Sequence, residues 1–284
     1  MLAATAFGLV ESTAIKKYNT KYDGGGFLFT AMVSFFSMLF FLLRYLITDS
    51  EKGDFTLRIL PYAFIAGVFY CTASFLTYIA LQIGPFAISI LILSYGIVIT
   101  SLYGILFLNE KISYLGCIGF GLIIISLFLL RGRDDNESKS FSYKWLICIA
   151  LSVFCSSGFS IVTKMQQVTF SDSVNNEFKI ISLAVSATIL LIVGAFNTKG
   201  GMKRILKTGA PYSFMAGMSN GANNMLGMLI NTMVPLSISS PTRSVMKTLL
   251  TFAVAYFVIR ERFLPRQLIG VLLSTVAVII INVA

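Results

Sequence analysis

Two basic residues stand four positions apart inside an apolar stretch near the carboxyl end of the sequence. Arg243 and Lys247 are about one helical turn apart, so their charges would project from the same helical face. A charge at the centre of a membrane helix costs roughly 2.5–3.5 kcal/mol on insertion scales, so this pair should face protein or water. An arginine can grip a carboxylate or a phosphate through two parallel hydrogen bonds. The pair therefore predicts binding of an anionic group. In the structural alternative, Glu11 neutralises one charge and the other points to the aqueous end of the helix.

The stretch before this pair carries four asparagines on one predicted helical face. Counted from the first asparagine, the polar or small positions recur at spacings of three, four, seven and eleven, which gather on one side of a helix. Amides are expensive against lipid, so they are predicted to line a solute cavity or to join helices. The positions are Asn220, Asn223, Asn224, Gly227 and Asn231, with Asn220 and Asn224 the stronger cavity candidates.

A milder polar face occurs in the corresponding segment of the first half of the chain. Tyr70, Ser74 and Tyr78 repeat every four residues and so share one side of a predicted helix. These three side chains are predicted to complete the opposite wall of the same cavity.

Glu11 is the one acidic residue that falls well within a predicted apolar run. A carboxylate that is partly removed from water can take up and release a proton during a transport cycle, so Glu11 is a candidate for coupling to protons. Two structural alternatives stay open. Glu11 could pair with a lysine or arginine of a neighbouring helix, or it could lie at a wet helix start.

The remaining reactive residues form no pattern that indicates catalysis. The sequence has no histidine, and its four cysteines form no C-x-x-C pair, so neither a metal nor another cofactor is expected. No nucleophile, base and acid occur in a recognisable arrangement, and an enzyme is not expected. The glycines of Gly116–Gly121 lie inside an apolar run without a preceding strand, which favours helix packing over phosphate binding.

Composition indicates that the lipid bilayer surrounds this chain. Hydrophobic residues make up 56% and charged residues 12%, against roughly 45–50% and about 25% in soluble domains. The formal net charge is +10, which raises the question of nucleic-acid binding. However, the charges lie between apolar runs and form no continuous basic stripe with interleaved aromatics, so nucleic acid is not an expected partner.

The apolar runs are each about as long as the roughly 20 residues that cross a bilayer as a helix. They lack the two-residue alternation of barrel strands, so all ten are predicted to be helices. Very short turns at Gly84–Pro85 and Val234–Pro235 predict tight antiparallel hairpins. The runs cover residues 2–17, 25–47, 58–82, 85–107, 112–131, 145–167, 176–196, 208–232, 234–259 and 263–283.

The second half of the chain repeats the first. Placing Pro211 on Pro61 also aligns, without a gap, Tyr212 with Tyr62, Gly217 with Gly67, Pro235 with Pro85 and Ser244 with Ser94. Residues 1–131 and 145–284 are predicted to be two five-helix repeats, joined by a polar linker over 132–144. Because five is odd, the second repeat would enter the membrane in the opposite sense. The predicted fold is an all-α membrane protein with ten transmembrane helices in two inverted five-helix repeats.

Two further segments are paired between the halves. Phe107–Ile112 is followed by Gly119, and Ile259–Leu264 is followed by Gly270. Together with the duplication, these segments resemble the EamA-type branch of the drug/metabolite transporter superfamily over essentially the whole chain. The resemblance implies a basket of ten helices that moves a small metabolite by alternating access, with a substrate cavity between the halves. It does not identify the solute, since members of the family carry different compounds.

The resulting hypothesis is a secondary transporter for a small polar, anionic metabolite in a bacterial inner membrane. One alternative is a proton-coupled exporter of hydrophobic amines or drugs, in which Glu11 would matter and the basic pair would not. Another is a non-transporting membrane scaffold or an intramembrane enzyme. No residue pattern indicates an oligomeric state.

The distribution of basic residues conflicts with the membrane orientation that the resemblance implies. A cytoplasmic amino terminus leaves more lysines and arginines on the outer side, which is the reverse of the positive-inside rule. Lys164 and Lys179, near the ends of apolar runs, are counted here with the loop charges of the inner side.

Overall fold

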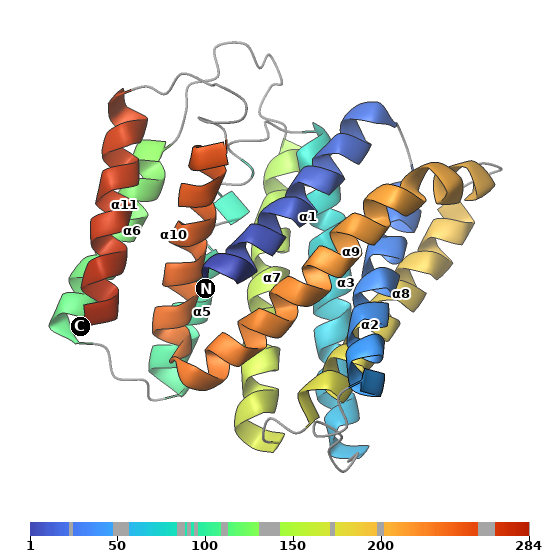
Figure 1. The fold of residues 1–284 in the computed structure, drawn as a ribbon, viewed down its shortest axis with the longest axis horizontal. Helices are drawn as coiled ribbons and strands as arrows, with labels where there is room; N and C mark the ends of the chain where they lie inside the picture. The colour runs from blue at the N-terminus through green and yellow to red at the C-terminus, as the bar shows by residue number, and fades with distance from the viewer. Residues whose placement is uncertain are drawn as a thin grey trace.

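The computed structural model describes the chain except for several connecting segments and parts of two predicted runs. The described residues are 1–22, 25–47, 57–83, 89, 92–93, 96–108, 113–130, 143–170, 174–197, 202–254 and 265–283. Within them the secondary structure is helical and no strand occurs. Figure 1 shows the arrangement. The helices are α1 (Leu2–Lys21), α2 (Gly26–Ile47), η2 (Leu57–Ile59), α3 (Leu60–Ile83), α5 (Gly96–Phe107), α6 (Tyr114–Leu130), α7 (Tyr143–Phe170), α8 (Asn175–Asn197), α9 (Met202–Met233), α10 (Leu236–Val254) and α11 (Pro265–Val283).

Four of these helices are long and apolar enough to cross a membrane: α2, α3, α7 and α8. Shorter apolar helical stretches cover Leu2–Ile15 in α1 and Tyr114–Ser126 in α6. A helix satisfies its own backbone hydrogen bonds, which lipid cannot do. The all-helical class is therefore confirmed for the described residues, and the chain is an integral membrane protein. Ten spans in two inverted repeats remain a prediction at this point.

Most predicted runs agree with helix bounds to within a few residues, and α9 differs by more at its start. The run predicted over 85–107 lies partly outside the described residues, and α5 covers its end from Gly96. Helix α9 begins at Met202 rather than near residue 208, so Pro211 lies inside it. The added turns of α9 contain methionine, lysine, arginine and leucine, which are good helix formers that an apolar-run criterion misses. The Gly84–Pro85 turn, the linker over 132–142 and residues 255–264 lie outside the described residues.

Helices of the first half pack mainly on helices of the second half. Helix α2 lies against α8 and α9, α3 lies against α7 and α8, α1 lies against α9, and α6 lies against α11. In Figure 1 the α6 and α11 pair stands at one end of the molecule and the α2 and α8 pair at the other. The two halves are thus interleaved rather than folded as separate bundles.

Two glycines allow the closest of these approaches. A Cβ on Gly67 would lie 2.6 Å from the Ser182 carbonyl oxygen of α8, and one on Gly217 would lie 2.7 Å from the Val33 carbonyl oxygen of α2. Both distances are too short for a carbon and an oxygen atom, so the backbones touch only because these side chains are absent. The two glycines are also counterparts in the predicted repeat.

The turn at Val234–Pro235 is short, as predicted, but it does not produce a tightly packed hairpin. The Pro235 carbonyl oxygen accepts hydrogen bonds from the backbone nitrogens of Ile238 and Ser239, which starts α10. Helix α10 then packs chiefly against α5, α1 and α11, and it diverges from α9 in Figure 1. The reason is that α1 and α2 already cover the faces of α9.

The close approach of α9 to α2 yields a stability prediction. Gly217→Ala should lower the free energy of unfolding by about 1–3 kcal/mol, because the new methyl group forces α9 away from the Val33 carbonyl. Gly121→Ala in α6 is the matched control, since a Cβ there would meet no heavy atom within 4 Å. Thermal unfolding of both variants in detergent checks this. Equal midpoints for the two variants would contradict the prediction.

Candidate functional site

The centre of the candidate site is the side chain of Asn220 on α9. Its Oδ1 atom accepts hydrogen bonds from Ser37 Oγ at 2.7 Å, Tyr70 OH at 3.0 Å and Asn224 Nδ2 at 2.9 Å. Its Nδ2 atom donates to Glu11 Oε1 at 2.8 Å. We call these five residues the Asn220 network. One amide thereby connects α1, α2, α3 and α9.

The contact between Tyr70 and Asn220 joins corresponding positions of the two halves. The alignment that places Pro211 on Pro61 also places Asn220 on Tyr70 and Asn224 on Ser74. Ser74 follows Tyr70 by one turn of α3, just as Asn224, which hydrogen-bonds Asn220, follows it by one turn of α9. The polar faces predicted separately for the third and eighth apolar runs therefore meet each other.

Glu11 belongs to this network and also interacts electrostatically with Lys247. Its side chain is half-buried, whereas Lys247 is exposed, and the Lys247 charge acts on the Glu11 carboxylate. This arrangement agrees with the structural alternative in which Glu11 balances one basic residue. It also leaves the Lys247 side chain at a surface, as a contact with solute would require.

Arg243 occupies a space that the absence of a side chain at Gly227 creates. A Cβ on Gly227 would lie 2.7 Å from Arg243 Nη1, and Arg243 Nη2 donates to Asn223 Oδ1 at 3.2 Å. The Asn223 amide in turn lies beside Gly8 of α1, where a Cβ would be 3.6 Å from Asn223 Nδ2. Arg243 is half-buried, so its guanidinium is held by α9 while part of it remains accessible.

Asn231 lies apart from this cluster and joins helices. Its Oδ1 atom accepts a hydrogen bond from Ser239 Oγ at 3.0 Å, and its carbonyl oxygen accepts one from Lys164 Nζ at 2.6 Å. It is only 7% exposed. Its contacts fix α9 to α10 and α7 rather than line a cavity.

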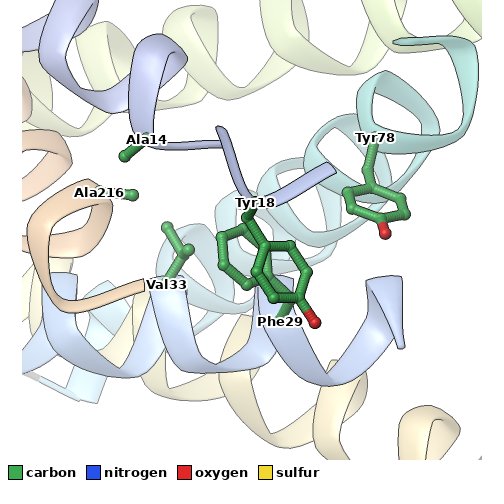
Figure 2. Packing of buried hydrophobic residues seen from close by; sticks show 6 residues of the cluster. All are labelled: Ala14, Tyr18, Phe29, Val33, Tyr78 and Ala216. Carbon is green, nitrogen blue, oxygen red and sulfur yellow. The ribbon is translucent and has the colours of Figure 1, made fainter. Parts of the chain in front are cut away.

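Tyr78 also lies apart, in an aromatic core. Figure 2 shows it with Tyr18, Phe29, Val33 and two alanines, and the rings of Tyr18 and Phe29 stack at 4.0 Å between centroids. Tyr78 is 4% exposed, and its hydroxyl accepts a hydrogen bond from Gln82. The predicted wall therefore ends at Ser74, because the next turn of α3 packs against this aromatic cluster.

Two polar residues escaped the sequence analysis. Ser37 is fully buried and donates to both the Gly217 carbonyl and Asn220, but a single serine in a phenylalanine-rich run gives no signal. Lys179 was counted with the loop charges, yet it is 2% exposed and lies inside the packed helices. Its position one turn inside α8 was the available signal.

Metal ligation has no support among the residues that the structure describes. No group of three or more histidine, cysteine, aspartate or glutamate side chains occurs there, and the four cysteines are free. The chemistry that the site offers is charge and hydrogen bonding.

Both the sequence and the fold of this chain have counterparts among known proteins. Residues 1–132 match the sequence profile of the EamA-like transporter family. That amino-terminal stretch of the chain is therefore similar to EamA-like transporters. EamA proteins are membrane transporters of the drug/metabolite transporter superfamily, which moves small molecules across bilayers. Glu11, Ser37 and Tyr70 of the Asn220 network lie within the matched stretch.

The fold of the EamA-type chain also occurs in a solved structure. A protein crystal structure matches it with a TM-score of 0.70 at 15% identity, over 99% of this chain and 96% of the other. That likeness concerns the fold alone. No curated protein matches the sequence.

The Asn220 network generates a prediction about stability. Asn220→Leu should lower the free energy of unfolding by about 1–3 kcal/mol or more, because Ser37, Tyr70 and Glu11 lose a buried partner. Asn197→Leu is the control, since that exposed amide donates to the Val193 carbonyl of its own helix, one turn away. Denaturation midpoints in detergent compare the two, and a drop of similar size in both would speak against the network.

Proposed function

We propose that this EamA-type protein is a secondary transporter of a small polar, anionic metabolite, built from two inverted five-helix repeats that alternate access to one central site. The observation that carries the proposal is that Glu11, the Asn220 network, Arg243 and Lys247 gather where helices of the two halves meet. Rare charges inside a membrane protein usually mark a solute or ion pathway.

The helix pairing supports the repeat. If the halves exchange roles, α1 corresponds to α7, α2 to α8, α3 to α9, α5 to α10 and α6 to α11. Under that exchange, the α1–α9 contact becomes the α3–α7 contact, and α1–α10 becomes α5–α7; both members of each pair occur. The chain direction of α1 is opposite to that of α7 in Figure 1.

Two contacts inside this arrangement support the same symmetry. Gly67 and Gly217 make matching close approaches to α8 and α2. Tyr70 and Asn220, which correspond in the repeat, touch each other directly, as residues near a two-fold axis would. The proposed site thus lies on the axis that relates the two access states.

The charge balance supports an anionic cargo. Arg243 and Lys247 bring two positive charges to the region, and Glu11 is an acidic side chain that interacts with Lys247. The planar guanidinium, already oriented by Asn223, suits a carboxylate or phosphate. In the proposed cycle, the Lys247 side chain leaves Glu11 and contacts the cargo. Asn224 and Asn223 orient the cargo.

Removal of the basic charges tests whether the cargo is anionic. Arg243→Gln and Lys247→Gln should each reduce uptake into proteoliposomes by at least tenfold, because the cargo loses a charge-assisted contact worth about 1.5–3 kcal/mol. Both variants should remain folded, as judged by size-exclusion profile and thermal midpoint. Lys203→Gln, on the exposed first turn of α9, is the control and should transport normally.

A panel of radiolabelled carboxylates, phosphate esters and hydrophobic amines separates the alternatives. Transport of amines that survives both substitutions would favour the drug exporter. A reconstituted protein that moves no solute in the panel would favour a scaffold, and product formation without translocation would favour an enzyme.

Glu11 provides a separate test of proton coupling. Glu11→Gln keeps the hydrogen-bond acceptor for Asn220 but cannot bind and release a proton. Uptake driven by a pH gradient should therefore be lost, whereas exchange of labelled for unlabelled cargo at equal pH should persist. Gradient-driven uptake at the wild-type rate would refute coupling through Glu11, while leaving the anion binding intact.

A further inference from the structure

Lys179 on α8 is a buried cation that the proposed function does not use. Its side chain is 2% exposed, and its Nζ atom donates to Thr163 Oγ1 of α7 at 3.2 Å. The same atom lies 4.0 Å from the centroid of the Phe159 ring and 5.5 Å from that of Phe178. A hydroxyl and two aromatic faces stabilise a cation much less than a carboxylate would.

Lys179 also experiences the positive charge of Arg243. The Arg243 guanidinium on α10 acts electrostatically on the Lys179 ammonium on α8. Among the described residues, the side-chain hydrogen-bond partner of Arg243 is the neutral Asn223 and that of Lys179 is the neutral Thr163. Two like charges in a low-dielectric interior repel each other, and neither of these hydrogen bonds supplies an opposite charge.

Two glutamines one turn along α7 from Thr163 add polar atoms without partners. Gln166 is fully buried, and neither its amide oxygen nor its nitrogen has a hydrogen-bond partner among the described residues. Gln167 donates to the Met228 carbonyl at 3.2 Å, but its Oε1 atom likewise lacks a donor there. Buried amides are normally paired, so these atoms remain available to bond a polar ligand.

The two sides of this region meet at α9. The Met228 carbonyl accepts the hydrogen bond from Gln167. Met228 directly follows Gly227, where the absence of a side chain makes room for Arg243. Thr163 and Gln167 are four residues apart on α7 and so share one face. This face, Lys179 and Arg243 therefore border the same part of α9.

We propose that an oxyanionic group of the cargo binds between Arg243 and Lys179, with the side-chain amides of Gln166 and Gln167 turning to complete its hydrogen bonds. This inference rests on the proposed function, since it requires an anionic cargo. Arg243 is half-buried and forms the entrance, whereas Lys179 is the enclosed end. Two cations suit a group with two ionised oxygens, such as a phosphate or a dicarboxylate, better than a monocarboxylate.

Direct binding measurements test this assignment. The purified full-length protein in detergent is titrated with inorganic phosphate, succinate or acetate at constant ionic strength, and the dissociation constant is taken from the saturable rise of the thermal midpoint. Wild type should bind phosphate or succinate more tightly than acetate. Lys179→Met should weaken the preferred dianion at least tenfold and reduce its advantage over acetate, whereas Lys179→Arg should stay within about threefold of wild type. Lys203→Gln should match wild type.

The outcomes separate this inference from the function on which it rests. If Lys179→Met binds the dianion like wild type while Arg243→Gln has lost it, Lys179 is structural and the inference is wrong, but an anionic cargo stands. If none of the three anions stabilises wild type saturably, the anionic cargo itself is refuted. Thr163→Val keeps the Lys179 charge and removes only the hydroxyl that accepts its hydrogen bond. This variant is therefore a second test if Lys179→Met does not fold. A several-fold weaker affinity supports the inference, and an unchanged affinity overturns it.

Discussion

The structure depends on the need of buried polar groups for partners where lipid and packed side chains provide none. Asn220 meets that need for four other side chains at once: its oxygen accepts from Ser37, Tyr70 and Asn224, and its nitrogen donates to Glu11. An amide oxygen has two lone pairs, so three donors crowd it, and the loss of any one helix would leave donors unsatisfied. The position of α1 beside α9 is thereby tied to the positions of α2 and α3.

Close backbone contact makes this network possible. Ser37 reaches Asn220 and also donates to the Gly217 carbonyl at 3.0 Å, which requires α2 and α9 to touch at that level. Because Gly67, its counterpart in the predicted repeat, makes the same kind of contact with α8, α3 and α8 are held together in the same way as α2 and α9. Small residues that bring helices together, and polar residues that then bond across them, are the usual means of association in lipid, where the hydrophobic effect between helices is absent.

Helical periodicity allowed much of the candidate site to be anticipated. Asn220, Asn224, Tyr70 and Ser74 were predicted from spacing, and they meet because a four-residue spacing places side chains on one face whatever the neighbours are. Spacing does not show at which turn of the helix that face stops packing against one neighbouring element and begins to pack against another. For this reason Tyr78 joined an aromatic core and Asn231 bonded to Ser239. Ser37 and Lys179 were missed because their importance comes from helices distant in sequence, as in the bond from Lys179 to Thr163.

The distribution of charge connects the proposed binding site to the proposed movement. Arg243, Lys247 and Lys179 bring three cations toward a region in which Glu11 is the described acidic side chain within electrostatic reach of one of them. An empty site that closes must desolvate unbalanced positive charge, whereas a site holding a doubly ionised cargo closes near neutrality. Since repulsion grows as water leaves, closure of the empty site would be the costlier transition. The same electrostatics would then select an anion and make the change of access depend on it, with no need for a separate gate.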